Sequence, residues 1–211
     1  MENLIRRLAQ IPTAPISDIM RRAGMGTGTM HSSMKPVWDG AEVCGPAFTV
    51  HTYPGATAGC DLALQHAKPG DVVVVAAGGI TEVIVWGEIY SAWAKQNGLG
   101  GTVIDGAARD IGGIREIGYP LFARAVTPGG ATADDTQSQL QIPVACAGVV
   151  VQPGDLLRGD ENGVVVIPAG NAAEVVERAE ALARKEARMV ELLRAGVDLP
   201  DAAGQCAEEG L

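Results

Sequence analysis

The amino-acid sequence predicts a mixed α/β fold, on three observations. Helix and strand patterns alternate through the first half of the 211 residues, and the second half is richer in strand patterns. Hydrophobic residues make up 47% of the chain, enough to bury a sizeable core. Aromatic residues are only 4% while glycine occurs 28 times, so small and β-branched side chains should build that core, as in packed sheets. No internal boundary is convincing, and we expect one domain over residues 1–211.

The first half of the chain shows regular alternation. Residues 13–24 carry an apolar stripe at helical spacing, and a Pro-Gly turn precedes a run of valines at residues 72–75. In order, the predicted elements are a helical arm over residues 1–24, a long loop over 24–40, a strand over 43–53, a helix over 57–67 and a strand over 72–75.

The chain is organised around residues 86–110, WGEIYSAWAKQNGLGGTVIDGAARD. We expect a helix with Glu88 in its first turn, where a carboxylate is favourable, and an end at Gly98. A short strand should follow and stop at a turn formed by Asp105-Gly106, directly before Arg109-Asp110. The side of this helix expected to face the core consists of Ile89, Tyr90, Ala92, Trp93 and Ala94.

The second half contains more strands and ends in a long helix. That helix is amphipathic over residues 171–195, and an exposed helix of this length often packs on a partner subunit. The other predicted elements are a helix over 111–117, strands over 119–126 and 144–151, a loop over 127–141, a hairpin over 156–167 with its turn at 160–163, and a loose tail over 196–211.

Composition argues against several classes of protein. The net charge is −9 and no basic run occurs, which disfavours nucleic-acid binding. No apolar run approaches ~18 residues, and the first ten residues lack the apolar core of a signal peptide, so we expect a cytoplasmic protein without a membrane partner. The cysteines have no metal-binding spacing and are expected to be reduced and buried; they are Cys44, Cys60, Cys146 and Cys206.

A helix and the strand after it lie side by side, so the start of the first and the end of the second can face one cleft. Glu88 and Asp110 would then meet, and two carboxylates with water suit Mg²⁺. Arg109 offers a charged fork for a carboxylate or an oxyanion, and the free amides around Ile89 and Tyr90 offer a seat for a small anion. The simpler alternative is that Arg109-Asp110 caps the next helix and Glu88 is merely solvated.

Residues 98–110 fit the pattern GxxGxVIDGxxRD, and Glu88 precedes Arg109-Asp110 by the spacing acid, twenty residues, Arg-Asp. In these features the chain resembles the class II pyruvate aldolases of the RraA-like family, named after the regulator of ribonuclease E activity A. Those enzymes cleave 4-hydroxy-4-methyl-2-oxoglutarate and 4-carboxy-4-hydroxy-2-oxoadipate in aromatic-acid breakdown. The resemblance covers roughly residues 13–195. It implies a layered β/β/α swivelling-type domain that assembles as a homotrimer or homohexamer.

The resemblance also implies roles for single residues. Asp110 would bind a divalent metal, Mg²⁺ or Mn²⁺, directly; Glu88 would hold it through water, as would Glu186 of a neighbouring subunit. Arg109 and Glu88 would be catalytic, with Arg109 stabilising an enolate. Glu88 stands where the best-known members have aspartate. The residues expected to bind substrate are Trp86, Gly87, Glu88, Ile89, Tyr90 and Arg109.

The implied activity is metal-dependent retro-aldol cleavage of a 4-hydroxy-2-oxo acid to pyruvate and a second oxo acid, with oxaloacetate decarboxylation as a side activity. Two alternatives stay open. One is a non-catalytic regulator of ribonuclease E, although such proteins tend to lack the aspartate after the arginine. The other is a lyase of the same fold that acts on a sugar acid.

Overall fold

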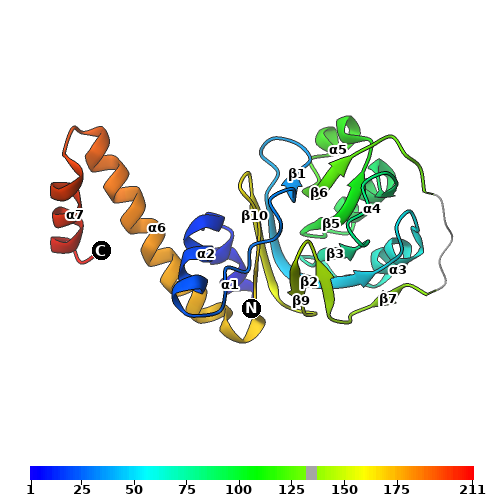
Figure 1. Cartoon of the computed structure of the whole chain (residues 1–211), viewed down its shortest axis with the longest axis horizontal. Coiled ribbons are helices and arrows are strands. Elements are labelled where there is room, and N and C mark those ends of the chain that lie inside the picture. The colour runs from blue at the N-terminus through cyan, green and yellow to red at the C-terminus, as the bar shows by residue number, and fades with distance from the viewer. Residues whose placement is uncertain (132–136) are drawn as a thin grey trace.

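The computed structural model describes residues 1–131 and 137–211, and one large mixed sheet dominates it (Figure 1). The sheet order is β1-β6-β5-β3-β2-β10-β11, with β4 paired to β5 and β7 paired to β2. The strands are β1 (Lys35–Pro36), β2 (Val43–His51), β3 (Val72–Ala76), β4 (Ile84–Trp86), β5 (Gly101–Ala108), β6 (Leu121–Val126), β7 (Gln139–Leu140), β10 (Leu156–Asp160) and β11 (Gly163–Ile167). A separate hairpin consists of β8 (Val144–Cys146) and β9 (Val149–Val151).

All the helices but α7 cover the sheet, wholly or in part, in two groups (Figure 1). The helices are α1 (Glu2–Leu8), α2 (Thr13–Arg22), α3 (Ala58–His66), α4 (Glu88–Gln96), α5 (Ile111–Ile117), α6 (Ala172–Arg194) and α7 (Leu199–Glu208). Helices α1, α2 and the start of α6 pack against β10 and β11, whereas α3, α4 and α5 cover the parallel strands on the other side. The predicted α/β class is confirmed.

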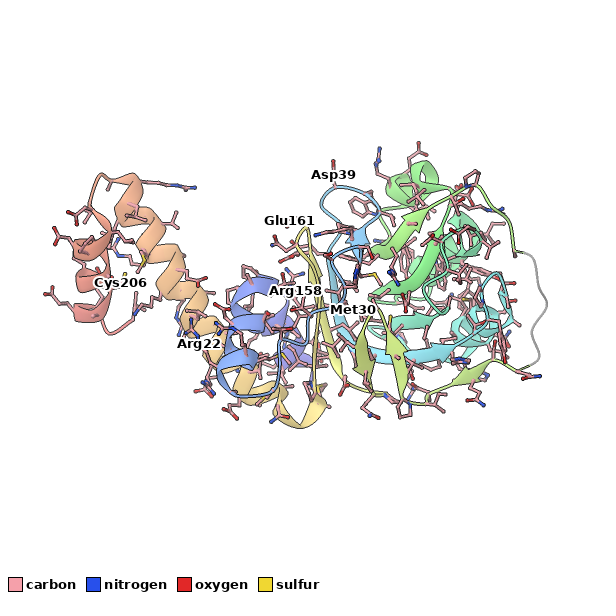
Figure 2. The ribbon with its side chains drawn as sticks, in the orientation of Figure 1. Arg22, Met30, Asp39, Arg158, Glu161 and Cys206 are labelled. Atoms are coloured by element: carbon pink, nitrogen blue, oxygen red, sulfur yellow. The ribbon has the colours of Figure 1, made fainter. Side chains whose placement is uncertain are left out.

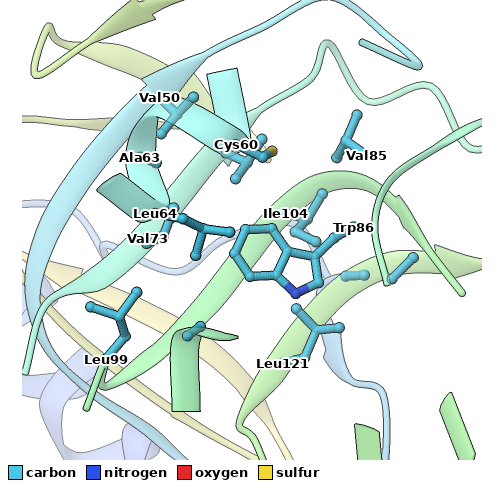
Figure 3. Close-up of a cluster of buried hydrophobic side chains, with 14 of the residues drawn as sticks. Val50, Cys60, Ala63, Leu64, Val73, Val85, Trp86, Leu99, Ile104 and Leu121 are labelled. Atoms are coloured by element: carbon cyan, nitrogen blue, oxygen red, sulfur yellow. The ribbon is translucent and has the colours of Figure 1, made fainter. Parts of the chain in front are cut away.

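The centre of the sheet is parallel, from β2 through β3 and β5 to β6. All five residues of β3 are buried, because a central parallel strand is covered on both faces. The carboxyl ends of these strands therefore lie along one edge, and Arg109 follows the end of β5 there. Figure 3 shows the core beneath this edge, where the indole of Trp86 packs among Leu64, Ile104 and Leu121.

The turn predicted at Asp105-Gly106 is wrong, because β5 continues through both residues to Ala108. Asp105 stays in the sheet since its carboxylate accepts a hydrogen bond of 3.1 Å from Arg124 on the neighbouring β6. A Cβ at position 106 would stand only 3.3 Å from the Ala77 side chain and 3.4 Å from the Ile80 carbonyl, so glycine lets both approach closely. Here the glycine serves close packing, not chain reversal.

Two further predictions need correction. Residues 144–151 form two strands, since Ala147 and Gly148 adopt positive φ of 47° and 83° and reverse the chain. The tail is not loose: α7 begins at a cap, where the Asp198 carboxylate accepts from the Asp201 amide. Ala202 and Cys206 of α7 are fully buried against the end of α6.

The C-terminal half of α6 and α7 form an arm, residues 183–211, that extends away from the sheet (Figure 1). Figure 2 shows Cys206 inside this arm, at the end of the molecule opposite the parallel strands. All four cysteines are free thiols, and all but Cys44 are buried. Within the described residues, no helix combines the length and apolar character needed to cross a membrane.

Asp160, at the predicted hairpin turn, acts as a structural residue. It is 3% exposed, and its carboxylate accepts hydrogen bonds from the Thr13 amide, the Thr13 hydroxyl and the Asn162 amide. It therefore closes the turn and satisfies the open start of α2, 147 residues away in sequence. Asp71, in the Pro-Gly turn before β3, serves for comparison. Its carboxylate accepts a hydrogen bond from the Lys68 amide within the same turn and anchors no distant helix.

Asp160→Ala is therefore expected to lower the free energy of unfolding by about 3 kcal/mol, because it leaves buried donors unsatisfied. Asp71→Ala should cost about 1 kcal/mol or less, since water can replace its bond. Urea unfolding of both variants at one protein concentration measures the difference. Equal losses would mean that Asp160 does not anchor α2.

Candidate functional site

The candidate site forms where β4 and β5 run parallel and both end. Trp86 pairs with Ala108, and the Arg109 amide donates to the Trp86 carbonyl at 3.2 Å. Helix α4 starts directly after β4, and α5 starts directly after β5. The two helix starts are therefore neighbours, and the Glu88 amide lies 3.4 Å from Oδ2 of Asp110. Residues more than twenty positions apart thus meet, as the sequence pattern suggested.

Asp110 has an unusual backbone conformation. It precedes α5 in the left-handed region, with φ 62° and ψ 37°, which costs free energy for a residue with a side chain. Its carboxylate makes no capping bond to its own helix. It lies instead against Gly87, where a Cβ would be only 2.7 Å from Oδ2. Asp110 occupies the N-cap position of α5, as the simpler alternative expected, but its side chain does not cap that helix.

Glu88 and Arg109 complete the charged part of the site. The Glu88 carboxylate lies directly over Gly113 in α5, so closely that a methyl group there would displace it. Arg109 places its Nε 3.4 Å from Asp110 Oδ2, and 44% of its side chain is exposed. A guanidinium with so long an ion pair and so much exposure remains accessible to an anionic ligand.

A cavity of about 210 Å³ unites these groups, and a shallower hollow of about 420 Å³ adjoins it at Arg109 and Asp110. The start of α4 opens into the cavity, and its N-cap residue, Gly87, has no side chain to cap it. The Glu88 amide donates to Asp110, which leaves the amides near Ile89 and Tyr90 to face a small carboxylate. The residues that line the cavity include Thr57, Gly87, Glu88, Ile89, Tyr90, Arg109 and Asp110.

Trp86 also borders the cavity, but its side chain is fully buried. Its indole Nε1 donates to Ser91 Oγ at 3.0 Å, and the ring belongs to the core (Figure 3). The indole therefore supports the start of α4 from below and does not present a surface to a substrate.

The predicted inward side of α4 is right for Ala94 and for Tyr90, which packs against the core, but wrong for Ile89, Ala92 and Trp93. Ile89 is 84% exposed and Trp93 40% exposed, whereas Ser91 and Ala94 are fully buried. The helix turns its small residues to the core because the Trp86 and Tyr119 rings already fill that space. Its large apolar side chains are left on the surface beside the cavity.

Tyr90 is a functional candidate whose side chain the sequence pattern did not single out. Its hydroxyl donates to Oδ1 of Asp61 on α3 at 2.6 Å. Burial, together with this hydrogen bond, raises the pKa of the Tyr90 hydroxyl above its usual value, so the phenol stays protonated. The contact joins residues 29 positions apart, on α3 and α4, and no local sequence pattern predicts it.

The chain matches the family described as RraA-like (Aldolase/RraA) over residues 13–166. It belongs to the RraA-like family. A relative from Halalkalibacterium halodurans, named as a candidate 4-hydroxy-4-methyl-2-oxoglutarate aldolase, is 35% identical over 178 residues, which are 84% of this chain and 82% of the relative.

Two solved structures are similar over most of the chain. An uncharacterized protein from Pseudomonas syringae pv. tomato has a TM-score of 0.86 at 33% identity, covering 97% of this chain and 94% of that one. RraAS2 of Streptomyces coelicolor, an unusual member of the RNase ES inhibitor RraA protein family, has a TM-score of 0.74 at 32% identity, covering 88% and 94%. The RraA-like fold predicted from residues 98–110 is therefore confirmed.

In this RraA-like chain Glu186 lies away from the cavity. It projects from α6 on the other side of the sheet, beside a separate hollow of about 480 Å³ that it shares with Pro15, Val190 and Arg194. Within one chain it cannot join Asp110, so any role at the site requires a second copy.

The donor set of the site is made of oxygen atoms. Among the described residues, no group of three or more His, Cys, Asp or Glu side chains is arranged to hold a metal ion. Among the described residues that line the cavity, Asp110 and Glu88 are the two that carry carboxylates. Such a pair fits Mg²⁺ or Mn²⁺, hard cations that keep several waters and need few protein ligands, and does not fit a soft metal.

Asp110→Gly and Asp110→Ala both remove the carboxylate, but only glycine adopts positive φ without strain. We expect the glycine variant to be more stable than the alanine variant by about 1 kcal/mol. Urea unfolding at equal protein concentration compares them. Equal stability, or a more stable alanine variant, would argue against stored strain at Asp110.

Proposed function

We propose that this protein is a divalent-metal-dependent lyase that cleaves a 4-hydroxy-2-oxo acid into pyruvate and a second carbonyl compound. The observation that carries the proposal is that Arg109, Asp110 and the start of α4 line one cavity. The aldolase name of the Halalkalibacterium halodurans relative supports the reaction class, and it gives the second product as an oxo acid.

The pyruvyl end of the substrate is bound by the start of α4 in this proposal. Its carboxylate accepts hydrogen bonds from the free amides near Ile89 and Tyr90, where the helix dipole is favourable. Arg109 faces the 2-oxo oxygen and neutralises charge there. Gly87 keeps the approach open, since any side chain at that position would meet Asp110.

Asp110 would hold the metal directly, and Glu88 and the neighbouring subunit's Glu186 would hold it through water. When bound, the cation supplies Lewis-acid stabilisation of negative charge on the 2-oxo group. Asp110 suits this task because its carboxylate is 43% exposed and the hydrogen bond that it accepts from the Glu88 amide is long, 3.4 Å.

The bond that breaks joins C3 and C4. The C4 hydroxyl loses its proton through water held by Glu88, C4 becomes a carbonyl, and the electron pair is delocalised onto the 2-oxo oxygen. Arg109 stabilises that oxyanion, and protonation at C3 releases pyruvate. Oxaloacetate carries the same head group, so its decarboxylation through the same enolate is the expected side activity.

A homotrimer or homohexamer would bring the neighbour's Glu186 to the site. The arm presents exposed Val190, Leu193 and Leu199, and α4 presents exposed Ile89 and Trp93. These are different apolar surfaces of one chain. Contact between them would be heterologous, and such contacts form closed rings when the rotation permits.

A non-catalytic regulator is the competing function, and the likeness to RraAS2 favours it. Such a protein acts through protein contacts and needs no metal. Asp110 argues for the enzyme, because its backbone adopts a strained left-handed conformation although its side chain does not cap α5.

The test is pyruvate release from oxaloacetate and 4-hydroxy-4-methyl-2-oxoglutarate with Mg²⁺ or Mn²⁺, before and after chelation. Arg109→Ala is expected to lower kcat on the order of 10²–10³-fold, as loss of one oxyanion donor does. Arg115→Ala, an equal change in exposed α5, is the control and should keep activity. Metal-independent turnover, or a nearly normal Arg109→Ala enzyme, would reject the mechanism.

Gly113 and Gly112 offer a matched pair of variants. A methyl group at Gly113 meets the Glu88 carboxylate, whereas one at Gly112 meets nothing within 4 Å. Gly113→Ala should weaken Mn²⁺ binding and activity on the order of 10–100-fold, the usual effect of disturbing a group that holds a metal indirectly. Gly112→Ala should leave both unchanged. Equal behaviour of the two variants in a Mn²⁺ titration would exclude Glu88 from the metal site.

A further inference from the structure

The hollow of about 420 Å³ adjoins the cavity at the place where the proposed substrate leaves it. Among the described residues, Arg109 and Asp110 line both spaces, whereas the start of α4 lines the cavity and not the hollow. In the proposed binding mode the C1 carboxylate lies at the start of α4 and the C2 oxygen at Arg109. C3 and C4 follow beyond Arg109, and the hollow is the space that opens there.

The far side of the hollow is formed by the chain at the end of β6, at Val126, Thr127 and Pro128. Val126 is the register partner of Ala108 at the end of β5. The Thr127 amide donates to the Ala108 carbonyl at 3.1 Å. Strand pairing therefore holds Thr127 next to Arg109, and a side chain at position 127 has a fixed place beside the site.

The Thr127 hydroxyl has a proton available for a ligand. Its oxygen accepts a hydrogen bond from the Gly129 amide at 3.3 Å, and among the described residues no acceptor receives its proton. The hydroxyl of Thr57, which lines the cavity and not the hollow, is engaged instead with Tyr90. Because a hydroxyl supplies a single donor, Thr127 can donate to a ligand and Thr57 has no second proton to give.

The charge of the hollow suits an anion when a divalent cation is bound. Arg109 is the one cation and Asp110 the one carboxylate among the described residues that line it. In the proposed function Asp110 is paired with the metal, which leaves a net positive charge beside the Thr127 hydroxyl. Val126, 58% exposed, and Pro128 add apolar surface. The lining therefore matches a group that combines a carboxylate with a small apolar substituent.

We infer that the C4 end of the substrate occupies this hollow and that Thr127 donates a hydrogen bond to a carboxylate on C4. The inference rests on the proposed function and names a residue that sets its specificity. The reaction balances as before: the C4 hydroxyl gives up its proton, the C3–C4 bond breaks and C3 is protonated. The carboxylate stays on C4, so the second product is an oxo acid.

Two substrates that differ in one group test the hydroxyl. 4-Hydroxy-4-methyl-2-oxoglutarate carries a carboxylate on C4 where 4-hydroxy-4-methyl-2-oxopentanoate carries a methyl group, and both release pyruvate. Thr127→Val removes the donor at nearly constant volume. It should lower the kcat/KM of the carboxylate substrate relative to the methyl substrate on the order of tenfold, the scale of a hydrogen bond to a charged group. Thr127→Ser keeps the donor and should retain the wild-type ratio.

Two controls separate this contact from a general disturbance of the site. Thr57→Val makes the same change in the cavity and should leave the ratio of the two substrates as in wild type. Competitive inhibition by pyruvate should be unchanged in Thr127→Val, because pyruvate ends at C3 and does not reach the hollow. Unchanged inhibition also shows that the variant is folded.

Occupancy of the hollow is tested by bulk. Val126→Trp fills the hollow and should lower the kcat/KM of both substrates on the order of tenfold, the scale of lost pocket space, while inhibition by pyruvate stays as in wild type. Val150→Trp makes the same change on β9 at a position of similar exposure, 62% against 58%. Val150 lines neither space, and its variant should behave as wild type.

Three results overturn the inference while pyruvate is still released by wild type. They are an unmoved ratio in Thr127→Val, an equal fall of the ratio in Thr57→Val, and wild-type turnover of both acids by Val126→Trp. Release of pyruvate from none of these acids by wild type with Mg²⁺ or Mn²⁺ rejects the proposed function as well, so the two failures are distinguishable.

Discussion

The parallel pairing of β4 with β5 is the constraint on which the site depends. The three-residue strand β4 is anchored by the buried Trp86 and lies beside the end of β5. The bond from the Arg109 amide to the Trp86 carbonyl aligns the two chain exits. The start of α4 and the residues Arg109-Asp110 then have to face each other. Without this pairing the carboxylates, the guanidinium and the free amides would belong to separate parts of the surface.

The backbone strain and charge repulsion that this arrangement causes are concentrated at the site. Asp110 adopts positive φ, and its carboxylate lies against a glycine on one side while Glu88 lies over a glycine on the other. Among the described residues that line the cavity, the carboxylates of Glu88 and Asp110 outnumber the single cation, Arg109. A bound divalent cation would offset that excess, and the fold tolerates the strain because the sheet beneath is buried on both faces.

The family includes proteins named as aldolases and as ribonuclease inhibitors on one fold, so the fold does not decide the function. Whether a member of the family is an enzyme or an inhibitor depends on a few side chains at the cavity and on the surfaces around it. Here the exposed Ile89 and Trp93 flank the cavity, and Glu186 lies on the far side of the same chain. Glu186 could therefore reach the cavity only from a second copy of the chain, as the proposed function requires.

The sequence by itself determined the α/β class, the long α6, the Pro-Gly turns and the family, because these follow from local periodicity and a compact motif. It also indicated that Glu88 and Asp110 meet, since a helix and the strand after it lie together. Only the tertiary structure decided that Asp105-Gly106 stays in a strand, that the tail folds as α7 and that α4 exposes Ile89. It alone joined Tyr90 to Asp61. Each of these features depends on contacts outside its own segment, such as those made by Arg124, Leu192 and Tyr119. Local sequence patterns do not predict such contacts.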